Sequence, residues 1–121
     1  MSEQDDAQPV PQAWRPTLKA IVAALASGDF ELSSSVEGVE QPSAATAAQI
    51  RDYLADYGGT LDELPDASWQ TSLWQRTSPR SGNLVVDLWT VESGRSDMVL
   101  EVSVDIVAGT PRFLVHAVHV P

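Results

Sequence analysis

The chain has 121 residues, 43% of them hydrophobic and 20% charged, which is typical of one globular domain. Seventeen acidic against seven basic residues give a net charge of −10, which disfavours binding to nucleic-acid phosphates. The chain has no cysteine, which excludes disulfides and thiolate metal sites, and no apolar run long enough for a membrane span. We therefore expect a cytoplasmic protein with neither a nucleic-acid nor a membrane partner.

The first residues differ in composition from the rest of the chain. Residues 1–11 are polar, begin with acidic side chains where a signal peptide would be basic, and contain Pro9 and Pro11. They lack hydrophobic periodicity, so we expect a flexible acidic arm. A single folded domain is then expected to span residues 12–121.

Two helices are predicted after the arm. The first should begin near Pro16 and end at Gly28. The second should begin after an N-cap at Ser43, run over residues 44–57 and stop at Gly58. Apolar residues spaced by three and four positions predict one buried stripe on the first helix: Leu18, Ile21, Val22 and Leu25.

The second half of the chain alternates between apolar and polar residues, as strands do. This period predicts strands over Ser68–Arg76, over both arms of a hairpin running from Leu84 to Ile106, and over residues 112–120. Helices followed by strands indicate an α+β fold, with two N-terminal helices packed on one face of a four-stranded antiparallel meander.

The hairpin has a predicted register. A three-residue loop ending at a left-handed Gly94 pairs Leu88 with Met98 and Val86 with Leu100, which keeps the apolar residues on one face. The opposite face, called here the outer face, then carries Val85, Asp87, Trp89, Asp97, Val99, Glu101, Ser103 and Asp105.

The register of the last strand stays open. If Ile106 faces Phe113, His116 opposes Ser103; if Ile106 faces Leu114, His119 opposes Glu101. Either register places one histidine among carboxylates, since opposed Cβ atoms lie about 5 Å apart. Such a group could hold a divalent cation or perform acid/base chemistry, but solvated side chains on a wet sheet face are the favoured interpretation.

Binding residues are predicted on the outer face. Tryptophan and arginine dominate binding interfaces, and three tryptophans (Trp69, Trp74 and Trp89) occur in the strand region. Asp87, between apolar neighbours, is expected to pair with Arg95 or Arg76. The candidate binding residues are Asp87, Trp89, Arg95, Asp97 and Glu101.

No catalytic residue, metal ligand or cofactor site is assigned. The sequence contains no glycine-rich phosphate loop, no Gly-x-Ser-x-Gly elbow and no His-Glu-x-x-His motif.

Several short motifs in the chain are similar to those of a known protein family. They are Tyr57-Gly58, Leu61, Glu63-Leu64-Pro65, Trp69, Val86-Asp87-Leu88-Trp89-Thr90, the run from Gly94 to Glu101, and His119-Val120-Pro121. Together they resemble a family of small uncharacterised bacterial proteins, a domain of unknown function. The resemblance implies domain boundaries and no activity. In size and charge alone the chain also resembles bacterial immunity proteins, which neutralise a partner toxin.

We therefore expect a non-enzymatic protein-interaction module whose acidic sheet face binds a basic partner protein, as an immunity-type inhibitor would. The alternative is a hydrolase or metal-binding protein that uses Glu101, Asp105 and a histidine. A homodimer through the sheet is a third hypothesis.

Overall fold

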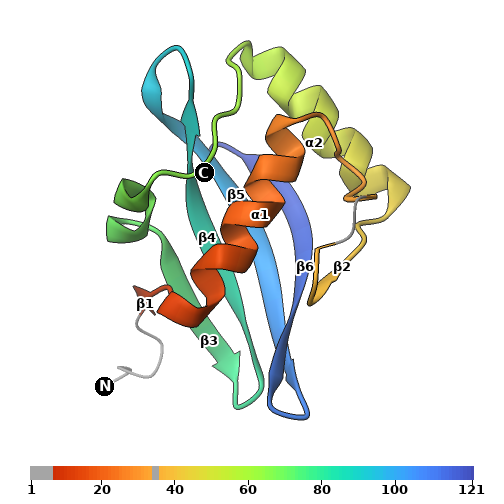
Figure 1. The fold of residues 1–121 in the computed structure, drawn as a ribbon, viewed down its shortest axis with the longest axis vertical. Coiled ribbons are helices and arrows are strands. Elements are labelled where there is room, and N and C mark those ends of the chain that lie inside the picture. Colours follow the sequence, from red (N-terminus) through yellow and green to blue (C-terminus); the bar gives the residue numbers. More distant parts are fainter. Residues whose placement is uncertain (1–6, 34–35) are drawn as a thin grey trace.

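A computed structural model describes residues 7–33 and 36–121 of the chain. Two α-helices, α1 (Arg15–Ala26) and α2 (Ala44–Tyr57), lie on one face of a six-stranded sheet with the order β1-β3-β4-β5-β6-β2. In Figure 1, α1 crosses in front of β4 and β5, while α2 lies beside β6. The α+β class and the common face of the helices are as predicted.

The centre of the sheet is the predicted antiparallel meander. It consists of β3 (Leu73–Ser78), β4 (Ser81–Thr90), β5 (Gly94–Val107) and β6 (Thr110–His119).

The count of four strands was wrong, because a two-residue strand adds to each side of the meander. β1 (Gln8–Pro9) pairs antiparallel with β3, and β2 (Val39–Glu40) pairs parallel with β6, so the sheet is mixed. Both additions come from segments without alternation, and they occupy backbone edges that the meander would leave unpaired.

The predicted arm of residues 1–11 covers two different parts. Residues 1–6 lie outside the described residues. Gln8 and Pro9 form β1, and Val10 is only 1% exposed within the core. The Arg15 side chain donates from Nε to the carbonyl oxygen of Val10 at 3.1 Å. Gln8, Pro9 and Val10 therefore belong to the folded structure, and a short 3₁₀ turn, η2 (Gln12–Trp14), leads into α1.

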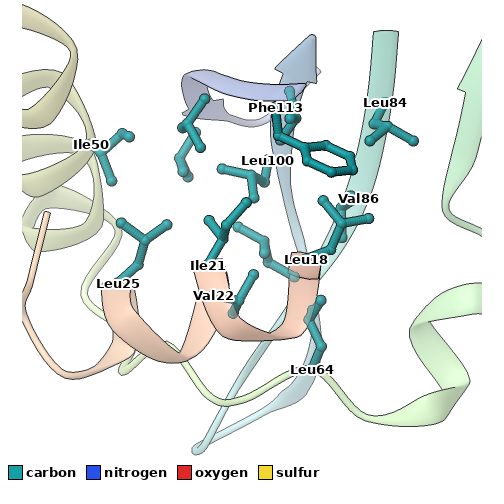
Figure 2. Packing of buried hydrophobic residues seen from close by; sticks show 14 of the residues in the cluster. Leu18, Ile21, Val22, Leu25, Ile50, Leu64, Leu84, Val86, Leu100 and Phe113 are labelled. Atoms are coloured by element: carbon teal, nitrogen blue, oxygen red, sulfur yellow. The ribbon is translucent and has the colours of Figure 1, made fainter. Parts of the chain in front are cut away.

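Both helices begin and end where local signals predicted. The Ser43 hydroxyl accepts the backbone N–H of Thr46, and Gly58 ends α2 in the left-handed conformation with φ 86°. The apolar stripe of α1 is buried against the sheet together with Ile50 of α2. Figure 2 shows these side chains meeting Val86, Leu100 and Phe113 from the strands.

The first predicted strand began too early. Residues Asp66–Gln70 form a 3₁₀ turn, η3, in which Ser68 and Trp69 point into the protein with 0% and 7% exposure. The backbone N–H of Ser72 donates to the carbonyl of Ser68 at 2.9 Å, which continues the turn up to the start of β3. Trp69, Thr71 and Leu73 are two positions apart in the sequence, as on one face of a strand, but Trp69 is buried whereas Thr71 and Leu73 are exposed.

The hairpin register is correct away from the loop and wrong beside it. Val86 pairs with Leu100 as predicted, but Thr90 pairs with Gly94, so that the loop is residues 91–93. Between these pairs, Leu88 faces a three-residue bulge, residues 96–98, instead of pairing directly with Met98. The Ser96 hydroxyl fills the gap: it donates to the Leu88 carbonyl at 2.8 Å and accepts the Met98 N–H at 3.1 Å.

Candidate functional site

The outer face of the meander remains accessible on the side away from the helices. Leu73 and Val85 are cross-strand neighbours there, with exposed fractions of 43% and 39%. The next residue across the sheet from Val85 is Glu101, which pairs in turn with Ala117 on β6. This rung therefore places two accessible apolar side chains beside a carboxylate.

A bulge in β6 brings both histidines to the outer face. Glu101 pairs with Ala117 and Val102 with Val115, so His116 is an extra residue. His116 Nε2 lies 2.8 Å from the Ser103 hydroxyl, and His119 Nε2 contacts the Glu101 carboxylate. Neither predicted register of the last strand is correct, because Ile106 pairs with Pro111. The bulge instead allows both histidine contacts, His116 with Ser103 and His119 with Glu101, although each predicted register would have produced only one of them.

The contact between Glu101 and His119 changes the pKa of the histidine. The pKa of His119 is raised above its ordinary 6.5, chiefly by the hydrogen bond that its ring donates to the Glu101 carboxylate, which outweighs the opposing effect of burial. The side chains of Glu101 and His119 are 45% and 33% exposed, so water partly screens the pair. The pair can exchange a proton with solvent or with a bound molecule.

A hollow of about 490 Å³ opens next to this pair. Its walls come from Gln75 of β3, Asn83 and Val85 of β4, Glu101 of β5 and His116 of β6, and it reaches down to the sheet near the buried Leu84 and Val102. Gln75 and Asn83 were not predicted as site residues. They are cross-strand partners, and continuing the outer-face alternation from β4 onto β3 would have identified them.

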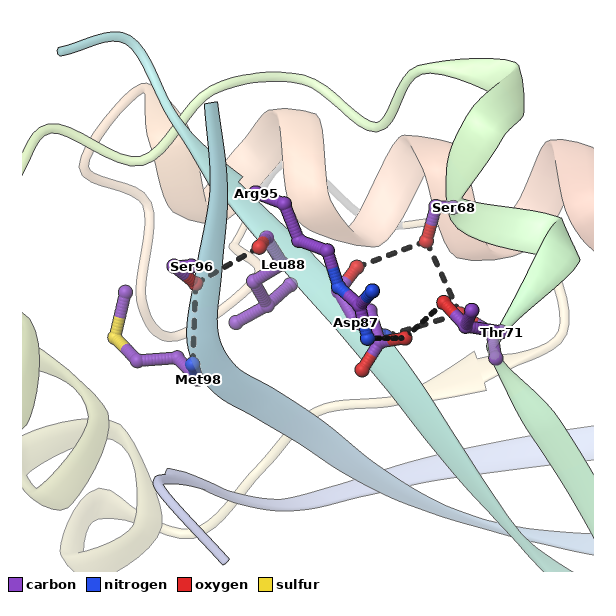
Figure 3. A network of polar contacts seen from close by, with 8 residues as sticks. Ser68, Thr71, Asp87, Leu88, Arg95, Ser96 and Met98 are labelled. Atoms are coloured by element: carbon purple, nitrogen blue, oxygen red, sulfur yellow. Dashed lines mark hydrogen bonds and ion pairs between the residues drawn. The ribbon is translucent and has the colours of Figure 1, made fainter. Parts of the chain in front are cut away.

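Asp87 belongs to a polar network at the edge of the sheet (Figure 3). Its carboxylate accepts a hydrogen bond from the Thr71 hydroxyl and lies 3.5 Å from an Arg95 guanidinium nitrogen, as one of the two predicted pairings required. Its backbone N–H donates to the Ser72 hydroxyl at 2.9 Å, and its carbonyl accepts from the Ser68 hydroxyl at 2.8 Å. The two serines thus take the place of a neighbouring strand beyond the start of β3 at Leu73.

Arg76, the other predicted partner of Asp87, makes a different contact, and two of the three tryptophans are not on the outer face. Arg76 donates to the carbonyl of Pro79 at 3.3 Å. Trp69 and Trp74 are buried on the helix side of the sheet. Trp74 packs edge-on against Trp14, with ring centroids 4.8 Å apart. These two tryptophans are core residues, so Trp89 is the member of the aromatic group that lies on the outer face.

The five predicted binding residues are not one cluster. The half-buried Trp89 pairs with Arg95, next to Asp87 near the hairpin tip. Asp97 is exposed within the bulge, where its N–H lies 3.5 Å from the Tyr57 hydroxyl on α2. Glu101 lies further along β5, at the hollow. Across the described ranges, no three histidine, aspartate or glutamate side chains gather closely enough to hold a metal ion.

These features define an α+β domain with a helix-covered core on one side of the sheet and, on the other, an accessible face that carries Glu101 and both histidines. The chain belongs to the family described as Domain of unknown function (DUF7668), whose model matches residues 22–121. No curated protein and no solved structure matches the chain. Within the described part of the chain, neither α-helix has the length and apolar character needed to cross a bilayer.

Proposed function

We propose that this protein is a non-enzymatic interaction module that binds a basic partner protein through its outer face. The observation that carries the proposal is the accessible pair Leu73 and Val85 beside the carboxylate of Glu101. An apolar centre with charged surroundings is the usual anatomy of a protein interface.

The charge of the chain supports a basic partner. The net charge is −10, the outer face also carries the exposed Asp105, and Asp97 is exposed in the bulge of β5. A surface of one sign accelerates association with a partner of the opposite sign, and this acceleration weakens as salt screens the charges. An immunity-type inhibitor that masks a basic toxin in the cytoplasm fits these properties.

Affinity capture from a native lysate at low and high salt tests the proposal. We expect the wild-type chain to retain a basic protein at low salt and to retain less at high salt. Val85→Lys should abolish capture, because it puts a positive charge at the centre of the face. Val107→Lys, at an exposed residue at the end of β5, is the matched control and should retain the partner.

Two results would contradict the proposal. The first is the absence of a partner at either salt concentration, and the second is equal capture by both lysine variants. Light scattering of the purified chain distinguishes a foreign partner from a second copy, because a homodimer through the same face would dissociate in Val85→Lys alone.

The second candidate function is acid/base hydrolysis, which the position of Glu101 supports. This carboxylate contacts His119 and also lines the hollow with His116, so a bound substrate would meet two groups able to transfer protons. An activated ester offers a direct assay. If wild type hydrolyses the ester and Glu101→Gln does so more slowly, an enzyme is favoured. Equal hydrolysis rates for wild type, Glu101→Gln and buffer alone would remove this candidate.

A further inference from the structure

We infer that the hollow on the outer face binds an arginine side chain presented by the partner. This inference rests on the proposed function and specifies its chemistry. The shape of the hollow, the groups that line it and the charge around it favour this occupant.

The hollow lies between two neighbouring rungs of the sheet. In one rung Val85 pairs with Glu101, and in the other Gln75 pairs with Asn83. Glu101 therefore contributes a carboxylate on one side and Gln75 and Asn83 contribute side-chain amides on the other, with Val85 between them. His116, the extra residue of the β6 bulge, closes a further wall.

A guanidinium group matches this lining. It is planar, carries five N–H donors and has no acceptor, so it needs several acceptors spread around its edge. A carboxylate can accept two parallel hydrogen bonds from it, and amide carbonyls can accept others. Its weakly hydrated faces can pack against an apolar side chain, here Val85. A lysine ammonium is a compact charge that would engage fewer of these groups.

The charge and size of the site agree with this occupant. Glu101 is about half exposed and contacts His119 through one oxygen, which leaves acceptor positions on the carboxylate for a second donor. The volume of about 490 Å³ accommodates a guanidinium and its aliphatic stem. Because the whole chain is acidic, a cation is attracted to this face before contact.

The test titrates the full-length protein with Nα-acetyl-argininamide and, separately, with Nα-acetyl-lysinamide, observed by nuclear magnetic resonance. The arginine probe should produce saturable shifts at the side-chain amides of Gln75 and Asn83 and at the methyl groups of Val85. A single side chain supports a dissociation constant on the order of 1–10 mM. The lysine probe should bind roughly three- to ten-fold more weakly.

Glu101→Gln is the decisive variant, because it keeps the side-chain shape and removes the charge. It should weaken the arginine probe by roughly three- to ten-fold. Glu31→Gln is the matched control: it changes net charge equally at an exposed carboxylate beside α2, and it should leave the affinity unchanged. Circular dichroism of both variants verifies that they fold.

Failure of this inference is distinguishable from failure of the proposed function. Non-saturable shifts, equal affinity for both probes, or no effect of Glu101→Gln would overturn the arginine site. A partner that Val85→Lys loses but Glu101→Gln binds as well as wild type would overturn it while leaving the proposed function intact. Specific arginine binding without any captured partner would support the site and contradict the proposed function.

Discussion

The side-chain amide of Gln49 on α2 pairs with both backbone groups of Val118 on β6. Its Nε2 donates to the Val118 carbonyl at 2.9 Å, and its Oε1 accepts the Val118 N–H at 3.3 Å. Two residues on, the Val120 N–H donates to the Tyr53 hydroxyl at 2.9 Å. With β2 covering the earlier part of β6, side chains of α2 thus continue the protection of this sheet edge.

Gln49→Ala should therefore destabilise the protein by about 1–2 kcal/mol, since two partly buried hydrogen bonds are lost at about 0.5–1.5 kcal/mol each. Urea unfolding measures the change. Gln70→Ala, at an exposed residue of η3, is the control and should stay within about 0.5 kcal/mol of wild type. Equal midpoints for the two variants would show that Gln49 does not stabilise the edge.

Ser72→Ala tests whether serine hydroxyl groups take the place of a neighbouring strand at the backbone of Asp87. Ser72 is 1% exposed and accepts the Asp87 N–H, so its removal leaves a partly buried donor without this partner. The expected loss in the free energy of unfolding is about 1–3 kcal/mol. Ser93→Ala, in the exposed hairpin loop, should change little. A wild-type midpoint for Ser72→Ala would mean that Asp87 finds another partner.

Gly82→Ala tests the packing between β3 and β4. A Cβ at position 82 would lie 2.5 Å from the Gln75 carbonyl oxygen and closer still to the Trp74 ring. The carbonyl oxygen can move only if the strand does, so we expect a loss of about 1–3 kcal/mol and an altered Trp fluorescence spectrum. Asn83→Ala, at the next and exposed residue, is the control. If both variants unfold alike, the crowding is relieved at no cost.

The pair formed by His119 and Glu101 predicts a pH dependence of stability. The pKa of His119 is raised above 6.5 in the folded chain, so the folded state favours the protonated ring. The resulting stabilisation is complete below the unfolded pKa and is lost as the pH rises through the folded pKa. The advantage of wild type over Glu101→Gln should be larger at about pH 6 than at about pH 9. Because both side chains are about a third or more exposed, it should stay under about 1 kcal/mol.

Nuclear magnetic resonance gives an independent measurement of the same pair. The titration midpoint of His119 should fall toward 6.5 in Glu101→Gln, because the largest cause of the raised pKa is gone. An unchanged midpoint would show that Glu101 does not set the pKa of this ring.

The elements that local interactions specify were predictable from the sequence. The cap at Ser43, the stop at Gly58 and the apolar stripe of α1 act over three to seven positions, so each is visible without knowledge of the fold. The division of β4 and β5 into an inner and an outer face was likewise predictable from period-two alternation, and it placed Asp87 and Glu101 on the outer face.

The tertiary structure alone decided the edges of the sheet and the composition of the site. The two short edge strands, β1 and β2, form because the unpaired backbone groups of the meander need hydrogen-bond partners. No side-chain pattern in the sequence indicates where such strands will form. In a regular strand, His116 and His119 are three residues apart and would point to opposite faces. One extra residue in β6 reverses that parity and places both rings on the face that holds Glu101. Alternation thus determined which residues of β4 and β5 share a face, whereas a bulge that depends on pairing with β5 determined that both histidines of β6 join Glu101 there.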